Sequence, residues 1–344
     1  MKKILKQVLG IDVAQKELVV CLGRMYDDLR LELYGYRTFA NTKKGFESMT
    51  EWVKKLTTEI ISVRYVMEAT GVYHESLAYY LEGNGCEVSI VLPNKISNYF
   101  RTLEINTITD KTASEAIARF GLERQLDRWK RPKQIFKNLK QLTRERDQIV
   151  ETRTIAKNQL HAEMAEAFPN PGSVARVKKL IKLLDKQVAE VIKEITVLLK
   201  QDKEVNKSIE TICSIPGVGR LTALTVLAET DFELIRNKRQ LTSYAGLDVR
   251  EKQSGTSIKG KPRISKKGNK HLRKAMHLPA LAAIRHEQKF KTVFVRLVSK
   301  HGIKMKAAVA VQRKLLEMIY TIYRTNTVYK KDYQKVNEAE TSMA

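Results

Sequence analysis

A heptad pattern in the middle of the chain constrains its fold more strongly than any other feature. Between residues 174 and 198, apolar side chains recur at alternating spacings of three and four residues. They are Val174, Val177, Ile181, Leu184, Val188, Val191, Ile195 and Leu198. This spacing places one apolar seam along a helix, which is typical of a coiled coil.

A second helix is predicted before that seam. Residues 135–160 follow the same spacing, with interruptions at Arg146 and Arg153. The segment FPNPGS (168–173) separates the two helices, because its prolines cannot continue either one. We therefore predict a helical coiled-coil hairpin over residues 129–204. We expect it to join subunits, and a simple spacer is the alternative.

Residues 1–128 show a different pattern. Three short β-rich runs come first, and helical and strand-like segments then alternate. The last element is a helix that we expect Asp110 to cap and Gly121 to end. This order predicts an α/β sheet with an antiparallel start, and the RNase H-like architecture is one such arrangement.

Residues 205–328 are predicted to be mainly α-helical, and residues 329–344 to form a polar tail. The segment SIPGVGRLTALTVLAE (214–229) resembles the hairpin of a helix-hairpin-helix motif, in which amides at a helix N-terminus face a phosphate. A plain glycine-rich turn between two helices is an equal alternative at this stage.

The positive charge of the chain is unevenly placed. The 344 residues carry a formal net charge of +25. Residues 1–125 hold 17 basic and 16 acidic side chains, whereas the remainder holds 46 and 22. Lys and Arg bind polyanions by releasing condensed counterions, so we expect a nucleic acid as the partner. An anionic membrane is the alternative, but no isolated amphipathic helix supports it.

Several features favour a cytoplasmic, nucleoid-associated protein. The three cysteines are far apart and form no C-x-x-C pair, which is typical of a reducing compartment. The first residues reach Asp12 too soon for the apolar region of a signal peptide. No run of about 18 apolar residues is long enough to span a membrane.

Three acidic residues of the balanced N-terminal segment stand at the ends of predicted elements. Asp12 lies in the apolar first strand, Glu68 ends the apolar run VRYVMEA, and Asp110 heads the last helix. A charge within such a strand is costly unless it has a function, and open α/β sheets bind ligands at strand carboxyl ends. Each residue has a structural alternative, as a turn residue, a surface charge or a helix cap. Together they favour a Mg²⁺ site for phosphodiester chemistry.

The segment REKQSGTSIKGKPRISKKGNK (250–270) is rich in Gly, Ser and basic residues, which is typical of a flexible phosphate-binding loop. Its serines need activation to attack phosphorus, and the residues alone do not choose between Ser254 and Ser257. Basic side chains crowd the following stretch and are candidate phosphate contacts, with a merely solvated surface as the alternative. They are Lys259, Lys261, Arg263, Lys266, Lys267, Lys270, Arg273 and Lys274.

Six motifs, in order along nearly the whole chain, resemble one family. GIDVAQKEL, MEATGVY and TDKTASEAIARFG are similar to the first domain of the bridge-RNA-guided insertion-sequence recombinases, the DEDD transposases. IPGVGRLTALTVLAE, QLTSYAGLDVREKQSGTSIKG and RISKKGNKHLRKAM are similar to their second domain. The resemblance implies a RuvC-like, RNase H-like first domain, a coiled coil, and a transposase domain that contains a catalytic serine.

The resemblance also implies site residues. It assigns a four-acid metal set to Asp12, Glu68, Asp110 and position 113, where this chain has Ala113. A methyl group cannot coordinate Mg²⁺, and Glu115 points about 200° around a helix from position 113. We therefore expect impaired chemistry, in either an inactivated variant or a natural degenerate copy. The resemblance further implies that Ser254 is the nucleophile and forms a covalent phosphoserine link to DNA.

The function implied by the resemblance is that of a Mg²⁺-dependent DNA transposase or recombinase of a mobile element. The implied partners are donor DNA, target DNA, a non-coding bridge RNA that pairs with both, and further copies of the chain, as a dimer assembling to a tetramer. Two alternatives stay open. One is a resolvase-like metal-dependent nuclease that hydrolyses DNA with water, and the other is a catalytically dead nucleic-acid-binding protein.

Overall fold

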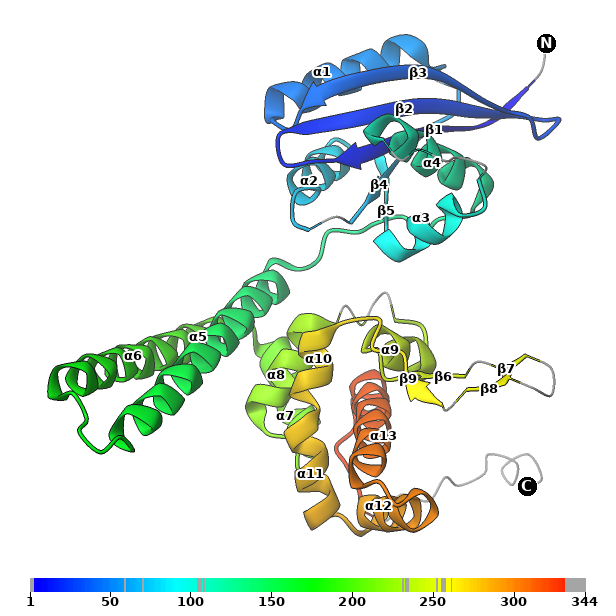
Figure 1. Ribbon diagram of the computed structural model, residues 1–344. Helices are drawn as coiled ribbons and strands as arrows, with labels where there is room; N and C mark the ends of the chain where they lie inside the picture. Colours follow the sequence, from blue (N-terminus) through cyan, green and yellow to red (C-terminus); the bar gives the residue numbers. More distant parts are fainter. Residues whose placement is uncertain are drawn as a thin grey trace, which may run out of the picture. The chain divides into compact units, whose positions relative to one another are not determined.

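The computed structural model describes residues 3–331, apart from 59, 70, 104–106, 108, 231, 233–234, 252, 255–257 and 261. The chain forms two compact units, Met1–Arg131 and Pro132–Ala344 (Figure 1). The first unit is mixed α/β and the second is mostly helical, which confirms the predicted fold class at that level. The finer domain boundaries at 128, 204 and 328 stay predictions. In the described part of the chain, no helix combines the length and apolarity needed to cross a membrane.

A five-stranded sheet organises the first unit, in the order β3-β2-β1-β4-β5. The first three strands pair antiparallel, and β4 and β5 continue the sheet parallel to β1. The antiparallel start and the later crossovers both agree with the sequence pattern. The strands are β1 (Ile4–Val13), β2 (Glu17–Tyr26), β3 (Leu31–Ala40), β4 (Val63–Glu68) and β5 (Glu87–Val91).

Helices cover both faces of this sheet, because successive side chains of a strand point to opposite faces. On β1, Leu9 packs into the cluster with α1 (Lys43–Leu56) and α2 (Glu75–Gly83). Its neighbour Val8 packs into a second cluster, with α3 (Pro93–Phe100) and α4 (Asp110–Glu123). The sequence pattern does not predict α3.

Two glycines let α4 lie directly against the sheet. A Cβ on Gly10 of β1 would stand 2.3 Å from the backbone nitrogen of Ala118, and a Cβ on Gly121 would stand 2.8 Å from a methyl of Val8. The prediction that Gly121 ends the helix is therefore wrong, since Gly121 is a packing residue and α4 continues to Glu123. This close approach fixes where the N-terminus of α4 lies relative to β1.

The second unit begins with two paired 31-residue helices, α5 (Gln134–Met164) and α6 (Pro171–Gln201). Asn170 caps α6 and Pro171 occupies its first position, so the predicted break between the helices is confirmed, although residues 171–173 of the predicted turn belong to α6. Five of the predicted seam positions of α6 are buried, Val177, Leu184, Val188, Val191 and Ile195, whereas Val174, Ile181 and Leu198 are only partly buried and the seam ends on Leu199. This shift arises because 3.6 residues per turn drift against a strict heptad. A supercoil and an oligomerising role stay predictions.

The remaining helices share one apolar core with the near ends of α5 and α6. In the turn between α7 and α8, Gly217 has a φ of +89°, and a Cβ there would stand 2.6 Å from the nitrogen of Ala283. The turn is therefore packed against α11, and its role in binding phosphate stays a prediction. The helices are α7 (Lys203–Cys213), α8 (Arg220–Glu229), α9 (Lys238–Tyr244), α10 (Lys270–Ala275), α11 (His277–His286), α12 (Gln288–His301) and α13 (Lys304–Thr325).

The predicted serine-containing loop is a narrow antiparallel ribbon. β6 (Val249–Arg250) pairs with β9 (Arg263–Ile264), and further out β7 (Gln253–Ser254) pairs with β8 (Ile258–Lys259). After α13 the chain returns to the α7–α8 turn, where the backbone N–H of Tyr329 donates to the Ser214 hydroxyl at 2.8 Å. Residues 332–344 of the predicted tail lie outside the described residues.

Candidate active site

Two of the three predicted acids lie side by side at the carboxyl ends of neighbouring parallel strands. The register of β1 and β4 pairs Ile11 with Met67, and Asp12 and Glu68 are the next residues of each strand. The third acid, Asp110, is the first residue of α4. Because α4 crosses β1 at Gly10, its N-terminus brings Asp110 to this same end of the sheet.

The electrostatics of Asp12 show that the three carboxylates are neighbours. Burial, and then the negative charges of Asp110 and Glu68, raise the pKa of Asp12 to about 6, against a partial opposing effect of the Val13 backbone N–H. Each of these causes disfavours the charged carboxylate, except the hydrogen bond. The site is therefore short of positive charge.

Asp110 does not cap α4, so that prediction is wrong. The N-cap is Thr109, whose hydroxyl accepts from the backbone N–H of Thr112 at 3.2 Å, while the Thr112 hydroxyl accepts from the Thr109 N–H at 2.8 Å. This reciprocal capping box satisfies the orphan amides at the helix start. The Asp110 carboxylate sits in the first turn, where the helix dipole favours a negative charge.

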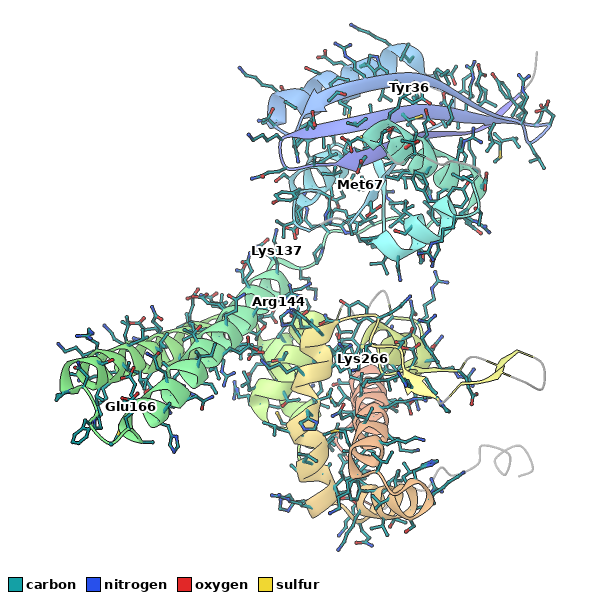
Figure 2. The ribbon with its side chains drawn as sticks, viewed as in Figure 1. Tyr36, Met67, Lys137, Arg144, Glu166 and Lys266 are labelled. Atoms are coloured by element: carbon teal, nitrogen blue, oxygen red, sulfur yellow. The ribbon has the colours of Figure 1, made fainter. Side chains whose placement is uncertain are left out.

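Position 113 holds an apolar residue in place of a carboxylate. Ala113 packs against the apolar cluster between α3 and α4. Two residues further along α4, Glu115 accepts a hydrogen bond from the hydroxyl of Tyr36 on β3, at 2.6 Å. Figure 2 labels Tyr36 on that strand. Glu115 therefore has a partner across the sheet, which supports the expectation that it does not replace an acid at position 113.

The three carboxylates match the ligand chemistry of a divalent metal. Carboxylate oxygens are the ligands that Mg²⁺ prefers, and Mg²⁺ usually takes one or two of them together with water and substrate phosphate. In the described part of the chain, no three His, Cys, Asp or Glu side chains converge as a ready-made centre. The coupling of Asp12 to Asp110 and Glu68 nevertheless places them within electrostatic reach. Coulomb interactions extend further than ligand contacts, so the three carboxylates are near enough to interact without forming a ready-made centre in the ion-free chain.

The other predicted catalytic residue lies on the ribbon of the second unit. The backbone of Ser254 is in β7, opposite Ile258. Lys259 follows on β8, while Ser257 and Lys261 lie outside the described residues. The ribbon is anchored at its base, because the Ser265 hydroxyl donates to Asp248 and the Ser265 N–H donates to the Asp248 carbonyl at 2.9 Å.

The predicted basic residues fall into two groups. Arg263, Lys266, Lys267 and Lys270 are exposed. Figure 2 labels Lys266 at the end of the ribbon, where its φ of +51° lies in the left-handed region. The two remaining described residues have intramolecular partners. Arg273 donates to the Ala245 carbonyl at 2.9 Å, and Lys274 pairs with Glu151 and lies 4.0 Å from Asp147.

A buried carboxylate next to residues 266–270, which we call the basic turn, was not predicted. The Glu229 side chain is fully buried and accepts two hydrogen bonds from Arg144 of α5, at 2.6 and 2.8 Å, and one from Asn269 at 2.7 Å. Burial tends to raise the pKa of Glu229, but these partners lower it below its ordinary value. Asn269 also caps α10, accepting from the N–H of His271 and Leu272. The signal in the sequence was a single acid at the end of the apolar run ALTVLAE.

The network thus ties three segments together. Figure 2 labels Arg144 on α5, and its guanidinium reaches Glu229 at the end of α8. The Tyr244 hydroxyl donates to the Glu229 carbonyl at 3.0 Å, and the Asn269 N–H donates to the Tyr244 carbonyl at 2.7 Å. The basic turn is therefore held in place by hydrogen bonds to the end of α8 and to α9.

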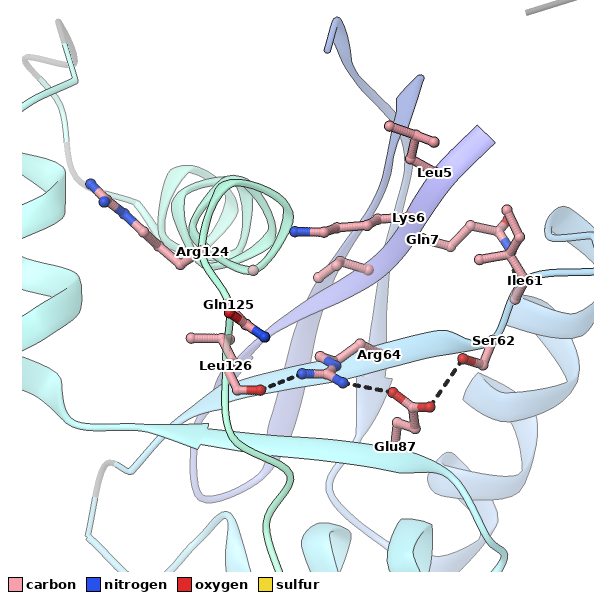
Figure 3. A pocket seen from close by; sticks show the side chains of 12 residues that line it. Leu5, Lys6, Gln7, Ile61, Ser62, Arg64, Glu87, Arg124, Gln125 and Leu126 are labelled. Atoms are coloured by element: carbon pink, nitrogen blue, oxygen red, sulfur yellow. Dashed lines mark hydrogen bonds and ion pairs between the residues drawn. The ribbon is translucent and has the colours of Figure 1, made fainter. Parts of the chain in front are cut away.

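A pocket of about 210 Å³ lies at the opposite end of the sheet from the acids (Figure 3). Arg64 lines it and donates to the Leu126 carbonyl at 2.5 Å and to Glu87 at 2.8 Å. Lys6 is also committed, since it donates to the Leu122 carbonyl at 2.9 Å. These polar groups close the end of α4 and are satisfied within the chain.

Comparison with known proteins supplies the family. Residues 9–169 match the family of DEDD transposases of IS110, described as transposase, and residues 209–294 match the family described as transposase IS116/IS110/IS902. The pilin gene-inverting protein of Moraxella bovis is 28% identical over 333 residues, which cover 95% of this chain and 98% of that protein. The transposase of the insertion element IS1111A from Coxiella burnetii is 24% identical, covering 94% of this chain and 91% of that protein.

One solved structure is also similar, that of T. thermophilus RuvC in complex with a Holliday junction substrate. Its TM-score is 0.27 with 12% identity, over 36% of this chain and 99% of that chain. The two family matches follow each other along one chain in the order of its two units. The chain therefore belongs to the IS110 family of transposases, enzymes that act on DNA in the recombination of insertion sequences.

Proposed function

We propose that this transposase cuts and rejoins donor and target DNA through a phosphoserine intermediate on Ser254, assisted by Mg²⁺ held by Asp12, Glu68 and Asp110. The observation that carries the metal site is the placement of Asp12 and Glu68 on adjacent strand ends with Asp110 at the start of α4, and burial and then the charges of Asp110 and Glu68 accordingly raise the pKa of Asp12. Three acids drawn from two strands and one helix repel one another at a single sheet end. A divalent cation would relieve that repulsion.

The proposed chemistry conserves the phosphodiester bond. The Ser254 oxygen attacks phosphorus, a serine–phosphorus ester forms, and the bond to one deoxyribose oxygen breaks. The proton that the serine loses ends on that leaving oxygen, giving a free hydroxyl. Attack by a hydroxyl of the other DNA then reverses the step and joins new partners. Bound Mg²⁺ supplies neutralisation of the phosphate charge.

The fold supports an RNase H-like first domain. Three antiparallel strands followed by two parallel strands, with helices on both faces, place Asp12 and Glu68 on adjacent strand ends. Ligands of open α/β sheets bind at such carboxyl ends. We extend this to a nucleoid-associated, cytoplasmic site of action, because the family acts on DNA.

Target choice is assigned to a non-coding bridge RNA that pairs with donor and target DNA. The exposed side chains of the basic turn, such as Lys266 and Lys267, contact phosphates and read no bases, so base pairing would supply the sequence information. We further propose a homo-oligomer, a dimer assembling to a tetramer, with the hairpin of α5 and α6 as the joining element.

Impairment by Ala113 is part of the proposal. If position 113 contributes a fourth carboxylate in active members, this chain binds metal more weakly and cleaves slowly. The alternative is a nucleic-acid-binding protein without catalytic activity.

Substitution tests separate these functions. Ala113→Asp should increase strand exchange between supercoiled donor and target plasmids supplied with the guide RNA. In that background, Ser254→Ala should abolish the covalent protein–DNA adduct and all strand exchange, whereas DNA binding persists. Hydrolysis that survives Ser254→Ala would instead support the metal-dependent nuclease. A chain that stays inactive after Ala113→Asp would support the binding protein.

A further inference from the structure

A second cationic surface lies on α12 and the start of α13, away from the ribbon and the basic turn. Between Arg285 and Leu316 the sequence contains a single acid, Glu287, and that residue is 5% exposed. The exposed side chains of this region include Lys289, Arg296 and Lys300, which we call the α12 stripe. This part of the molecule therefore presents positive charge to solvent with almost no compensation.

The three residues of the α12 stripe form a line on one flank of the helix. Arg296 and Lys300 follow Lys289 by seven and eleven residues. At 3.6 residues per turn, each of these separations is within about 20° of a whole number of turns. Phe290, about 100° around α12 from Lys289, anchors the helix in the core and is 2% exposed. At about 1.5 Å per residue, the line extends for roughly 16 Å. That length corresponds to about five steps of one DNA strand.

The turn after α12 extends the positive charge. Gly302 ends the helix with a φ of +71°, and α13 starts at Lys304, so that its first residues adjoin the end of α12 (Figure 1). Desolvation and the positive charges of Lys306 and Lys300 lower the pKa of His301, which places these groups close together.

The cations lack internal partners. Among the described residues, Lys289, Arg296, Lys300, Lys304 and Lys306 form no ion pair. The contrast within the same unit is Lys274, which is neutralised by Glu151. Like charges gathered without counter-ions destabilise a free protein by self-repulsion and are relieved by a polyanion.

We propose that the α12 stripe is a sequence-independent contact for the phosphate backbone of duplex DNA. Duplex DNA is chosen because the family acts on DNA, and because a straight, rigid row of point charges matches a regular backbone. The inference rests on that DNA-acting role alone and requires neither Ser254 nor a metal. Lysine binds phosphate as a point charge, and contacts to phosphates carry no sequence information directly.

The test compares two triple variants with the same loss of charge. Lys289→Gln, Arg296→Gln and Lys300→Gln together remove the α12 stripe. The matched control is Lys44→Gln, Lys54→Gln and Lys55→Gln, which removes three exposed cations from α1 of the electrically balanced unit. Binding to unrelated duplexes of equal length, and to a structured RNA, is measured by fluorescence anisotropy over a range of salt concentrations in EDTA.

Each phosphate contact contributes about 0.9 to the slope of log affinity against log salt. For the stripe variant, the slope of log affinity against log salt should therefore decrease in magnitude by about 3. This variant should bind every duplex on the order of 100-fold more weakly near 0.1 M salt. The control should bind like the parent chain. Arg296→Lys, which keeps the charge, should bind normally.

Three results would overturn the proposal. The stripe variant could match the control in slope, it could lose affinity only for the RNA, or it could change the oligomeric mass with no change in slope. Thermal unfolding checks that the variant is folded, and exposed substitutions should leave it unchanged. Because the measurement needs no cleavage, failure of the phosphoserine proposal leaves its outcome unaffected, and a parent chain that binds no DNA would count against the DNA-acting role itself.

Discussion

The N-terminal unit gathers three acids at the end of a sheet, whereas the C-terminal unit buries one acid, Glu229, among hydrogen-bond donors. In the first unit Asp12 is surrounded by like charges, and its pKa rises to about 6. In the second, Arg144 and Asn269 hold the pKa of Glu229 below its ordinary value despite burial. The charges of the first arrangement repel one another, whereas the second is paired within the chain. Similar residue types are thus crowded by like charge in one unit and matched by hydrogen-bond donors in the other.

The largest effect should follow from breaking the Glu229 network. Glu229→Ala removes the partner of a partly buried Arg144 and of Asn269, and should lower the free energy of unfolding of the C-terminal unit by about 3 kcal/mol. Chemical denaturation, followed by far-ultraviolet circular dichroism, measures this loss of stability. The exposed Glu194→Ala on α6 is the matched control and should change stability by less than about 0.5 kcal/mol. Equal effects of the two would show that the network is not a stabilising seat.

The network also carries pH dependence. Because the folded pKa of Glu229 is lowered, its contribution is present above its unfolded pKa, near 4.5, and is lost as pH falls through the folded value. The difference in stability between the parent and Glu229→Gln should therefore shrink in acid.

The next effect concerns the seat of α4. Gly10→Ala places a Cβ 2.3 Å from the backbone nitrogen of Ala118 and should cost the N-terminal unit about 2 kcal/mol, because backbone must move. Gly83→Ala is the matched control, since its Cβ would meet only the Arg131 guanidinium, at 3.5 Å. Thermal unfolding of the full chain measures both. A neutral Gly10→Ala would mean that α4 does not lie as closely as described.

A smaller effect is expected at the start of α4. Thr109→Ala removes the N-cap and should lower stability by about 1 kcal/mol, measured by chemical denaturation. Thr152→Ala on α5 is the control. The Thr152 hydroxyl donates to the Gln148 carbonyl within the same helix, so its loss should be nearly neutral. If Asp110→Ala costs more stability than Thr109→Ala, then Asp110 and not Thr109 is the cap.

The smallest change in stability, and the sharpest test of the acid cluster, is Asp110→Asn. Removing one like charge should lower the pKa of Asp12, as followed by NMR titration of its carboxyl carbon. In the metal-free chain the stability linked to Asp12 is present below its unfolded pKa of 3.8 and is lost as pH rises through about 6. Asp110→Asn should lessen that loss. The exposed Glu51→Gln on α1 should leave the pKa of Asp12 unchanged.

Periodicity and composition alone determined the α/β character of the first unit, the pair of helices around FPNPGS, and the placement of Asp12 and Glu68 at strand ends. These features depend on neighbours in sequence, which side-chain spacing and proline chemistry report directly. The resemblance in linked motifs added the family and the choice of Ser254.

Only the tertiary structure decided the rest. The position of Asp110 beside Asp12 depends on α4 packing against Gly10, and Thr109 rather than Asp110 takes the cap. Arg273 and Lys274 turned out to have internal partners, whereas the α12 stripe has none among the described residues. Glu229 meets Arg144 from 85 residues away. Such contacts arise from packing between distant segments, so local sequence carries no signal for them.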